Sequence, residues 1–147
     1  MTISIASILS RKGSEIWSVA PEATVYEAIA LMAQKGVGAM LVVSGGQLVG
    51  IVSERDYARK VMLLGRSSKD TLVKDIMTGK VITATPDNTV EECMRIVTHH
   101  HIRHLPVLDG GRLVGIVSIG DLVNAIIELQ AHTIDQLHTY ISGNYPA

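Results

Sequence analysis

Residues 45–56 read GGQLVGIVSERD, and residues 110–121 read GGRLVGIVSIGD. The two stretches lie 65 positions apart, and the same shift aligns residues 16–60 with residues 81–125 without a gap. Of these 45 aligned pairs, 14 are identical, whereas average residue usage would give about three by chance. The chain therefore contains one repeated unit in two copies, which is too few for a solenoid.

Each copy predicts the order strand, helix, strand, strand, helix. In the first copy a short strand is expected around residues 16–19, and Thr24–Glu27 is a capping box that begins a helix. The paired glycines Gly45–Gly46 supply the positive φ angles of a tight hairpin between two apolar runs. A second helix is expected to begin at Ser53 and to end near Gly65. The second copy repeats these signals 65 positions later, and its last helix is expected to continue to about residue 140.

The predicted fold is α/β (α+β), built from tandem βαββα repeats. A single unit of this kind leaves one face of its small sheet uncovered, so we expect the two copies to pack as a pseudo-twofold pair. The polar stretch 66–70 is interpreted as the linker. It divides the chain into a first repeat at 1–70 and a second repeat at 71–147.

Composition narrows the class of protein. The chain has 13 Lys and Arg against 14 Asp and Glu, a balance that favours neither nucleic acid nor an acidic membrane surface as a partner. The uncharged run 36–53 is interrupted by Ser44–Gln47, which predicts a hairpin instead of a membrane-spanning helix. Cys93 is the only cysteine, so we expect a small buried apolar residue in a reducing, cytoplasmic compartment.

The apolar content also predicts a homodimer. Hydrophobic residues make up 47% of the chain, and the C-terminal helix carries more of them than packing on one small sheet needs. The residues concerned are Leu122, Val123, Ile126, Ile127, Leu129, Ile134, Leu137 and Ile141.

Gly50–Asp56 and Gly115–Asp121 share a glycine, two apolar residues, a serine, two variable residues and an aspartate. Asp75–Thr78 and Arg103–Val107 add further matching stretches. On these residues the chain resembles a pair of cystathionine-β-synthase (CBS) domains, from about residue 8 to residue 129. It is similar to small stand-alone bacterial CBS-pair proteins related to the regulatory module of IMP dehydrogenase.

The resemblance implies a disc-like homodimer that binds an adenosine-containing ligand in the cleft between the two motifs. The ligand would be AMP, ADP, ATP or NAD, or in some relatives S-adenosylmethionine. The implied function is adenine-nucleotide sensing, with signalling to an unidentified partner protein. A constitutive dimeric scaffold that does not respond to a ligand is the alternative.

The Ser-x-x-Asp segments carry the chemistry that such a ligand needs. At Ser53 and at Ser118 a strand leads into a helix, whose first N–H groups and positive dipole end attract an anion. The aspartate of the first turn, Asp56 or Asp121, can accept two hydrogen bonds from a ribose diol. The same spacing is also that of a capping box, and the two roles can coexist.

The resemblance implies that further residues bind the ligand together with each Ser-x-x-Asp motif. The first group is Ser53, Arg55, Asp56, Thr83, Thr85, Arg103, His104 and Pro106. The second group is Ser118, Asp121, Ser18, Ala20, Gly38, Ala39 and Met40. The first group is polar and basic, and Arg59 is expected one helical turn beyond Arg55 on the same face, whereas the second group is small and apolar. Lys12 is one more cation, but the sequence does not fix its place.

Neither an enzyme nor a metal protein is predicted. The chain shows no Ser-His-Asp order, zinc spacing, activated cysteine or phosphate-loop lysine motif. Consecutive histidines at 99–101 point in different directions on a helix, whereas metal-binding helices favour histidines four residues apart. We interpret the three histidines as a polar helix end.

Overall fold

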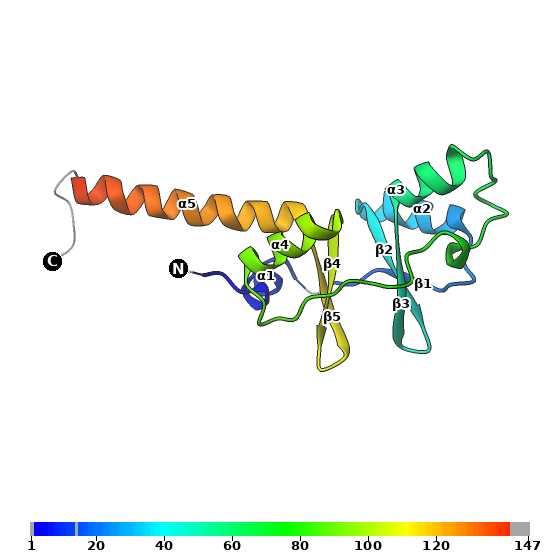
Figure 1. The fold of residues 1–147 in the computed structure, drawn as a ribbon, viewed down its shortest axis with the longest axis horizontal. Helices are drawn as coiled ribbons and strands as arrows, with labels where there is room; N and C mark the ends of the chain where they lie inside the picture. Colours follow the sequence, from blue (N-terminus) through cyan, green and yellow to red (C-terminus); the bar gives the residue numbers. More distant parts are fainter. Residues whose placement is uncertain (1, 14, 142–147) are drawn as a thin grey trace. The chain divides into compact units, whose positions relative to one another are not determined.

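The fold is that of a computed structural model, which describes residues 2–13 and 15–141 (Figure 1). The helices are α1 (Ile5–Lys12), α2 (Val25–Lys35), α3 (Glu54–Tyr57), α4 (Val90–His100) and α5 (Ile119–Ile141). The strands are β1 (Ser18–Val19), β2 (Ala39–Ser44), β3 (Gln47–Ser53), β4 (His104–Asp109) and β5 (Arg112–Ser118). A π-helical segment, Ala58–Met62, and a 3-10 turn, Val73–Asp75, complete the described elements.

The described residues form two compact units. One, which we call the first-repeat unit, contains residues 15–83 and 110–114. The other, the second-repeat unit, contains residues 2–13, 84–109 and 115–141. These units differ from a division of the chain at residue 70, because α1 belongs to the second-repeat unit.

The two repeats pair their strands in the same way. In the first, β1 runs parallel to β2, with Ser18 opposite Leu41, and β2 runs antiparallel to β3, with Ala39 opposite Ser53. In the second, β4 pairs with β5, and the strand expected around residues 81–84 is reduced to one parallel bridge between Ala84 and Val107.

The predicted helix starts are confirmed. Thr89 Oγ1 accepts a hydrogen bond from the Glu92 N–H at 3.1 Å, and Glu92 Oε1 accepts one from the Thr89 N–H at 2.9 Å, which completes the capping box of α4. At α2 the threonine half is present, since Thr24 Oγ1 accepts from the Glu27 N–H at 3.1 Å. Local sequence therefore fixes where both helices begin.

The helix expected from Ser53 to Gly65 is less regular than predicted. α3 has only four residues, and the chain continues as the π-helical segment, in which the Leu63 N–H donates to the Ala58 carbonyl at 3.0 Å. The Arg66 N–H donates in the same i to i+5 manner to the Val61 carbonyl. The wider turn accompanies the burial of Val61, while Arg59 stays exposed.

A short segment packs against the beginning of α2 in the first-repeat unit and of α4 in the second, through the same backbone bonds. We call these the leading segments: residues 71–78 for the first-repeat unit, and residues 3–12, which include α1, for the second. In the first-repeat unit the Val25 N–H donates to the Thr71 carbonyl, and the Val73 N–H donates to the Ala23 carbonyl, both at 2.8 Å. The second-repeat unit repeats this pattern, because the Val90 N–H donates to the Ile3 carbonyl and the Ile5 N–H donates to the Asn88 carbonyl, both at 2.9 Å. Ile5 and Val73 occupy matching places, and both are fully buried.

Gly50 and Gly115, the glycines of the two Gly-x-x-Ser motifs, lie where the leading segment of each unit crosses a strand. A Cβ atom added to Gly50 would lie 2.5 Å from Met77 Sδ, and one added to Gly115 would lie 2.7 Å from Leu9 Cδ2. Any larger residue would displace the docked side chain. The glycines thus permit the close approach of the leading segments.

Each unit has its own apolar core. The core of the first-repeat unit consists of Val25, Ala28, Met32, Met40, Val42, Val52, Val61, Val73 and Ile76. The buried apolar residues of the second-repeat unit are Ile5, Ile8, Ala84, Val90, Cys93, Val97, Leu105, Val107, Val117, Leu122 and Ala125. Cys93 is a free, buried cysteine, as predicted, and burial followed by the charge of Glu92 raises the pKa of its thiol to about 11.

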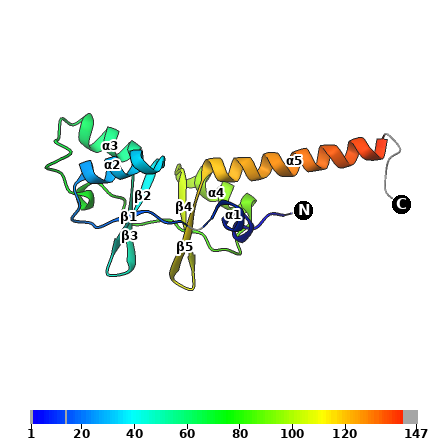
Figure 2. The ribbon, with the colours of Figure 1, turned by 180° about the vertical axis from the view of Figure 1, so that it is seen from behind.

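α5 is the longest helix of the second-repeat unit. In both views it extends beyond α1 and α4 (Figures 1 and 2). Leu122 and Ala125 are buried near its beginning, whereas residues 130–138 are all exposed. No helix within the described residues is long and apolar enough to cross a membrane.

Candidate functional site

The junction of β3 and α3 forms what we call the first corner, Ser53–Asp56. Ser53 Oγ accepts a hydrogen bond from the Asp56 N–H at 3.2 Å, and Asp56 Oδ2 accepts one from the Ser53 N–H at 2.9 Å. The Ser53 hydroxyl also lies 3.0 Å from Asp56 Oδ2. The capping role of this Ser-x-x-Asp segment is therefore confirmed.

The junction of β5 and α5 forms the second corner, Ser118–Asp121. Here Asp121 Oδ2 accepts from the Ser118 N–H at 2.8 Å, and Ser118 Oγ accepts from the Asp121 N–H at 3.1 Å. Both carboxylates keep contact with solvent, since the side chain of Asp56 is 19% exposed and that of Asp121 is 24% exposed. The two corners thus share the same reciprocal pair of capping bonds.

Capping leaves each aspartate able to bind something else. In both corners the bonds from the serine fall on Oδ2 of the aspartate. A carboxylate has about four acceptor positions, so Oδ1 of each aspartate keeps acceptor capacity for further donors. Ionised oxygens at a partly exposed helix start suit hydroxyl groups and cations.

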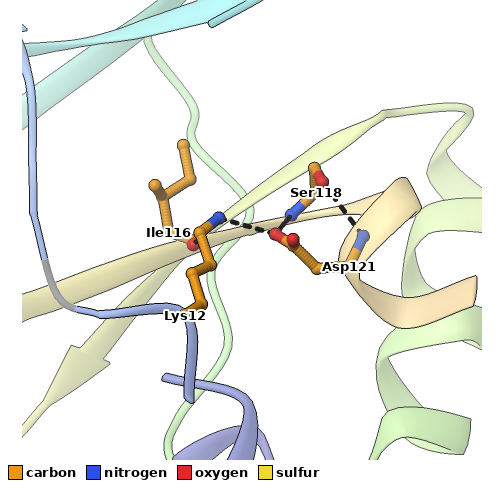
Figure 3. Close-up of polar contacts among 4 residues, drawn as sticks. All are labelled: Lys12, Ile116, Ser118 and Asp121. Carbon is orange, nitrogen blue, oxygen red and sulfur yellow. Dashed lines mark hydrogen bonds and ion pairs between the residues drawn. The ribbon is translucent and has the colours of Figure 1, made fainter. Parts of the chain in front are cut away.

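Each corner also holds a lysine. Lys60 Nζ lies 3.2 Å from Asp56 Oδ1 and donates to the Ile76 carbonyl at 2.8 Å. Lys12 Nζ donates to Asp121 Oδ2 at 2.6 Å and to the Ile116 carbonyl at 2.9 Å (Figure 3). The sequence left the position of Lys12 open, and the structure brings its ammonium group to the second corner from α1.

Asp121 is ionised at neutral pH. Burial raises the pKa of its carboxyl, but the hydrogen bonds from Lys12 and Ser118 and the lysine charge outweigh burial, so the pKa lies below its usual value. A lowered pKa in the folded state stabilises the fold at neutral pH, and that contribution is lost as the pH falls through the folded-state pKa.

The other predicted site residues divide between the units. Ser18, Ala20, Gly38, Ala39, Met40, Arg55 and Thr83 lie in the first-repeat unit, and Thr85, Arg103, His104 and Pro106 lie in the second-repeat unit. Beside the first corner, the Gly38 carbonyl accepts from the Glu54 N–H at 3.1 Å, and beside the second the Arg103 carbonyl accepts from the Ile119 N–H at 2.8 Å. The grouping of residues from both repeats around one ligand stays a prediction.

Exposure distinguishes which of these side chains can meet a ligand. Ser18, Ala20, Arg55, Thr85 and Arg103 are exposed, and Gly38, Thr83 and His104 are partly exposed. Ala39, Met40 and Pro106 are buried. Met40 belongs to the core of the first-repeat unit, which leaves only its backbone for a ligand.

The three histidines lie at the end of α4. His99 and His100 form its last turn, and His101 is the C-cap in the left-handed region, with φ of 54°. Among residues 2–13 and 15–141, no group of three or more His, Cys, Asp or Glu side chains is arranged to hold a metal ion.

Comparison with known proteins shows the family to which the chain belongs. The sequence pattern of the CBS domain matches residues 5–63 and again residues 73–128. The chain belongs to the CBS-domain family. The predicted resemblance is confirmed, and a CBS pair is typically a regulatory, ligand-binding module.

Individual relatives agree in sequence and in fold. The chain is 44% identical over 141 residues to the mitochondrial CBS domain-containing protein CBSX3 of Arabidopsis thaliana, which covers 92% of this chain and 68% of that protein. A protein with CBS domains from Burkholderia ambifaria has a solved structure that matches with a TM-score of 0.81 and 51% identity, covering 87% of this chain and 95% of that one. The predicted tandem βαββα fold is thus confirmed.

The relation to IMP dehydrogenase is also confirmed. The chain is 37% identical over 109 residues to that enzyme of Korarchaeum cryptofilum, covering 74% of this chain but 22% of the enzyme. The likeness is therefore to the CBS part of the enzyme.

Proposed function

We propose that this CBS pair is an adenine-nucleotide-sensing regulatory module that binds AMP, ADP, ATP or NAD and signals to a partner protein. The observation that carries the proposal is the pair of equivalent corners, in each of which a partly exposed aspartate keeps acceptor positions beyond its capping bonds. CBS domains generally bind adenosine-containing ligands, and an aspartate at a helix start suits the ribose diol that those ligands share.

The cationic side chains near the corners favour a phosphorylated ligand over a nucleoside without phosphate. Arg55, in the first turn of α3, and Arg103, directly before β4, are exposed cations, and each corner has a lysine within contact of its aspartate. Guanidinium and ammonium groups form charge-assisted hydrogen bonds with phosphate oxygens. We propose that the chain acts by binding, without turnover of the nucleotide, because neither corner offers a base-activated nucleophile.

Titration of the purified protein tests the proposal. Isothermal titration with AMP, ATP, NAD and adenosine should show saturable binding of at least one phosphorylated ligand, and mass spectrometry of the native protein should identify any ligand that co-purifies. A protein that binds none of the four would instead be the constitutive scaffold. Nucleotide hydrolysis that disappears in an Asp56→Ala variant would contradict binding without turnover.

We expect a homodimer, and α5 is the element that supports it. Leu122 lies in the core, but five apolar side chains of α5 are at least 36% exposed, namely Ile119, Val123, Ile127, Ile134 and Leu137. A second copy of the chain would remove this stripe from water. Ile141 also motivated the prediction, but its side chain lies outside the described part of the chain.

Multi-angle light scattering at micromolar concentration should give the mass of two chains. The double variant Ile134→Glu with Leu137→Glu should shift that mass toward one chain, because burying two carboxylates in an apolar contact is costly. Gln136→Glu adds one carboxylate at an exposed polar position of α5 and should leave the mass unchanged. A monomer mass for the unmodified protein would refute the dimer.

The compartment stays a prediction. We propose a cytoplasmic protein on the strength of its single free cysteine, although the relative from Arabidopsis thaliana is mitochondrial.

A further inference from the structure

The contact between Lys12 and Asp121 joins the first helix of the chain to the last. Lys12 Nζ donates to Asp121 Oδ2 and to the Ile116 carbonyl (Figure 3). An ammonium group has three donors, so these two bonds leave one donor. The side chain of Lys12 is 34% exposed, which keeps that donor accessible.

The position of Lys12 is fixed by the docking of α1. Ile5 and Ile8 are buried in the second-repeat unit, and the Leu9 side chain lies over Gly115. Arg11 forms an ion pair with Glu128 of α5. Lys12 is therefore held at the second corner by the whole helix, and not by one flexible side chain.

The second corner would otherwise have little to offer a phosphate. Its variable positions are Ile119 and Gly120, where the first corner has Glu54 and Arg55. Asp121 is ionised, and a phosphate brought close to its carboxylate would be repelled unless a cation lay between the two. Lys12 supplies that cation from the other end of the sequence.

We propose that Lys12 is the phosphate-contacting residue of the second corner and that it makes this corner select adenine nucleotides over adenosine. The proposal rests on the proposed function, because it assumes that the second corner binds a nucleotide. It assigns Asp121 to the ribose and the third donor of Lys12 to a phosphate oxygen. Adenosine, which has no phosphate, would need only Asp121.

The test uses an Asp56→Ala background, in which binding at the first corner is weakened. In that background Lys12→Met should weaken AMP binding about tenfold to a hundredfold, the range expected for one charge-assisted hydrogen bond. Adenosine binding should change by no more than about threefold. Lys12→Arg, which keeps the charge, should retain most of the preference for AMP.

Lys74→Met is the matched control. Lys74 is exposed in the 3-10 turn of the first-repeat unit, so the variant removes the same charge from the chain and should leave both affinities unchanged. Isothermal titration measures the affinities, and thermal unfolding verifies that each variant is folded. If Lys12→Met does not fold, added salt replaces it as the test, since salt should weaken AMP binding to the Asp56→Ala protein more than adenosine binding.

The outcomes separate this inference from the proposed function. Equal losses for AMP and adenosine in Lys12→Met, or no loss for AMP, would overturn the role of Lys12 while nucleotide binding itself stood. An Asp56→Ala protein that binds neither ligand would overturn it too, provided that the unmodified protein binds AMP. An unmodified protein that binds no nucleotide would refute the proposed function.

Discussion

Replacing Asp56 with alanine should weaken the binding of adenosine and of AMP by similar factors. Asp56 is the proposed acceptor of the ribose hydroxyls, and ribose is common to both ligands. A hydrogen bond to a charged group contributes about 1.5–3 kcal/mol, which corresponds to a loss of about tenfold to a hundredfold. Isothermal titration of the variant against the unmodified protein measures both losses.

The two arginines should behave differently from the aspartate. Arg55→Ala or Arg103→Ala should cost more affinity for AMP or ATP than for adenosine, because the guanidinium group has a partner only when a phosphate is present. Equal losses for AMP and adenosine in both variants would refute the assignment of these residues to phosphate.

Asp121→Ala is the matched control for Asp56→Ala. Both aspartates cap a helix by the same bonds, so both variants lose a similar capping contribution, about 1 kcal/mol of stability. We expect the first corner, whose predicted group is the more basic, to be the tighter nucleotide site. Asp121→Ala should therefore leave that site largely intact and remove the weaker one. The reverse result would mean that the second corner, with Lys12, is the tighter site.

Replacing Ile5 with alanine should lower the free energy of unfolding by about 2–5 kcal/mol, the usual cost of removing a large buried aliphatic side chain. The side chain of Ile5 is fully buried, and its N–H donates to the Asn88 carbonyl. Urea denaturation followed by far-ultraviolet circular dichroism measures the change.

Ser7→Ala is the control for the substitution of Ile5. Ser7 lies on the same helix with an exposed side chain, and its replacement should change the free energy of unfolding by less than about 0.5 kcal/mol. If Ile5→Ala were as mild as Ser7→Ala, then α1 would not be an integral part of the second-repeat core.

The repeat, the helix starts and the hairpins could be predicted because local chemistry determines them. Thr24 and Thr89 cap their helices through bonds that span three residues, and Gly45 and Gly110 adopt the positive φ angles that their hairpins require. Signals of this kind do not depend on distant parts of the chain. The two Ser-x-x-Asp corners belong to the same class, since all their capping bonds are local.

The docking of α1 and the position of Lys12 could not be predicted, because both depend on contacts between distant residues. Ile5 matches Val73 at a shift of 68 residues, whereas the repeats align at a shift of 65. An alignment without gaps therefore pairs Lys12 with Met77 and gives no indication that it reaches Asp121. At the shift of 68, Ile5, Ile8 and Leu9 align with Val73, Ile76 and Met77, so the leading segments share only their apolar pattern.

Each half of the sequence carries the leading segment that docks on the repeat in the other half. This arrangement has consequences for dividing the chain and for its evolutionary origin. A cut between residues 70 and 71 would separate residues 71–78 from the α2 end on which they dock, and α1 from α4. Each half would keep the segment that completes the other, so we expect neither half to fold by itself. In an ancestor with one repeat, the leading segment would have docked either on its own repeat or on the repeat of a second chain, as in a domain-swapped protein. After duplication within one gene, the two repeats of a single chain can exchange leading segments in the way that two separate chains would.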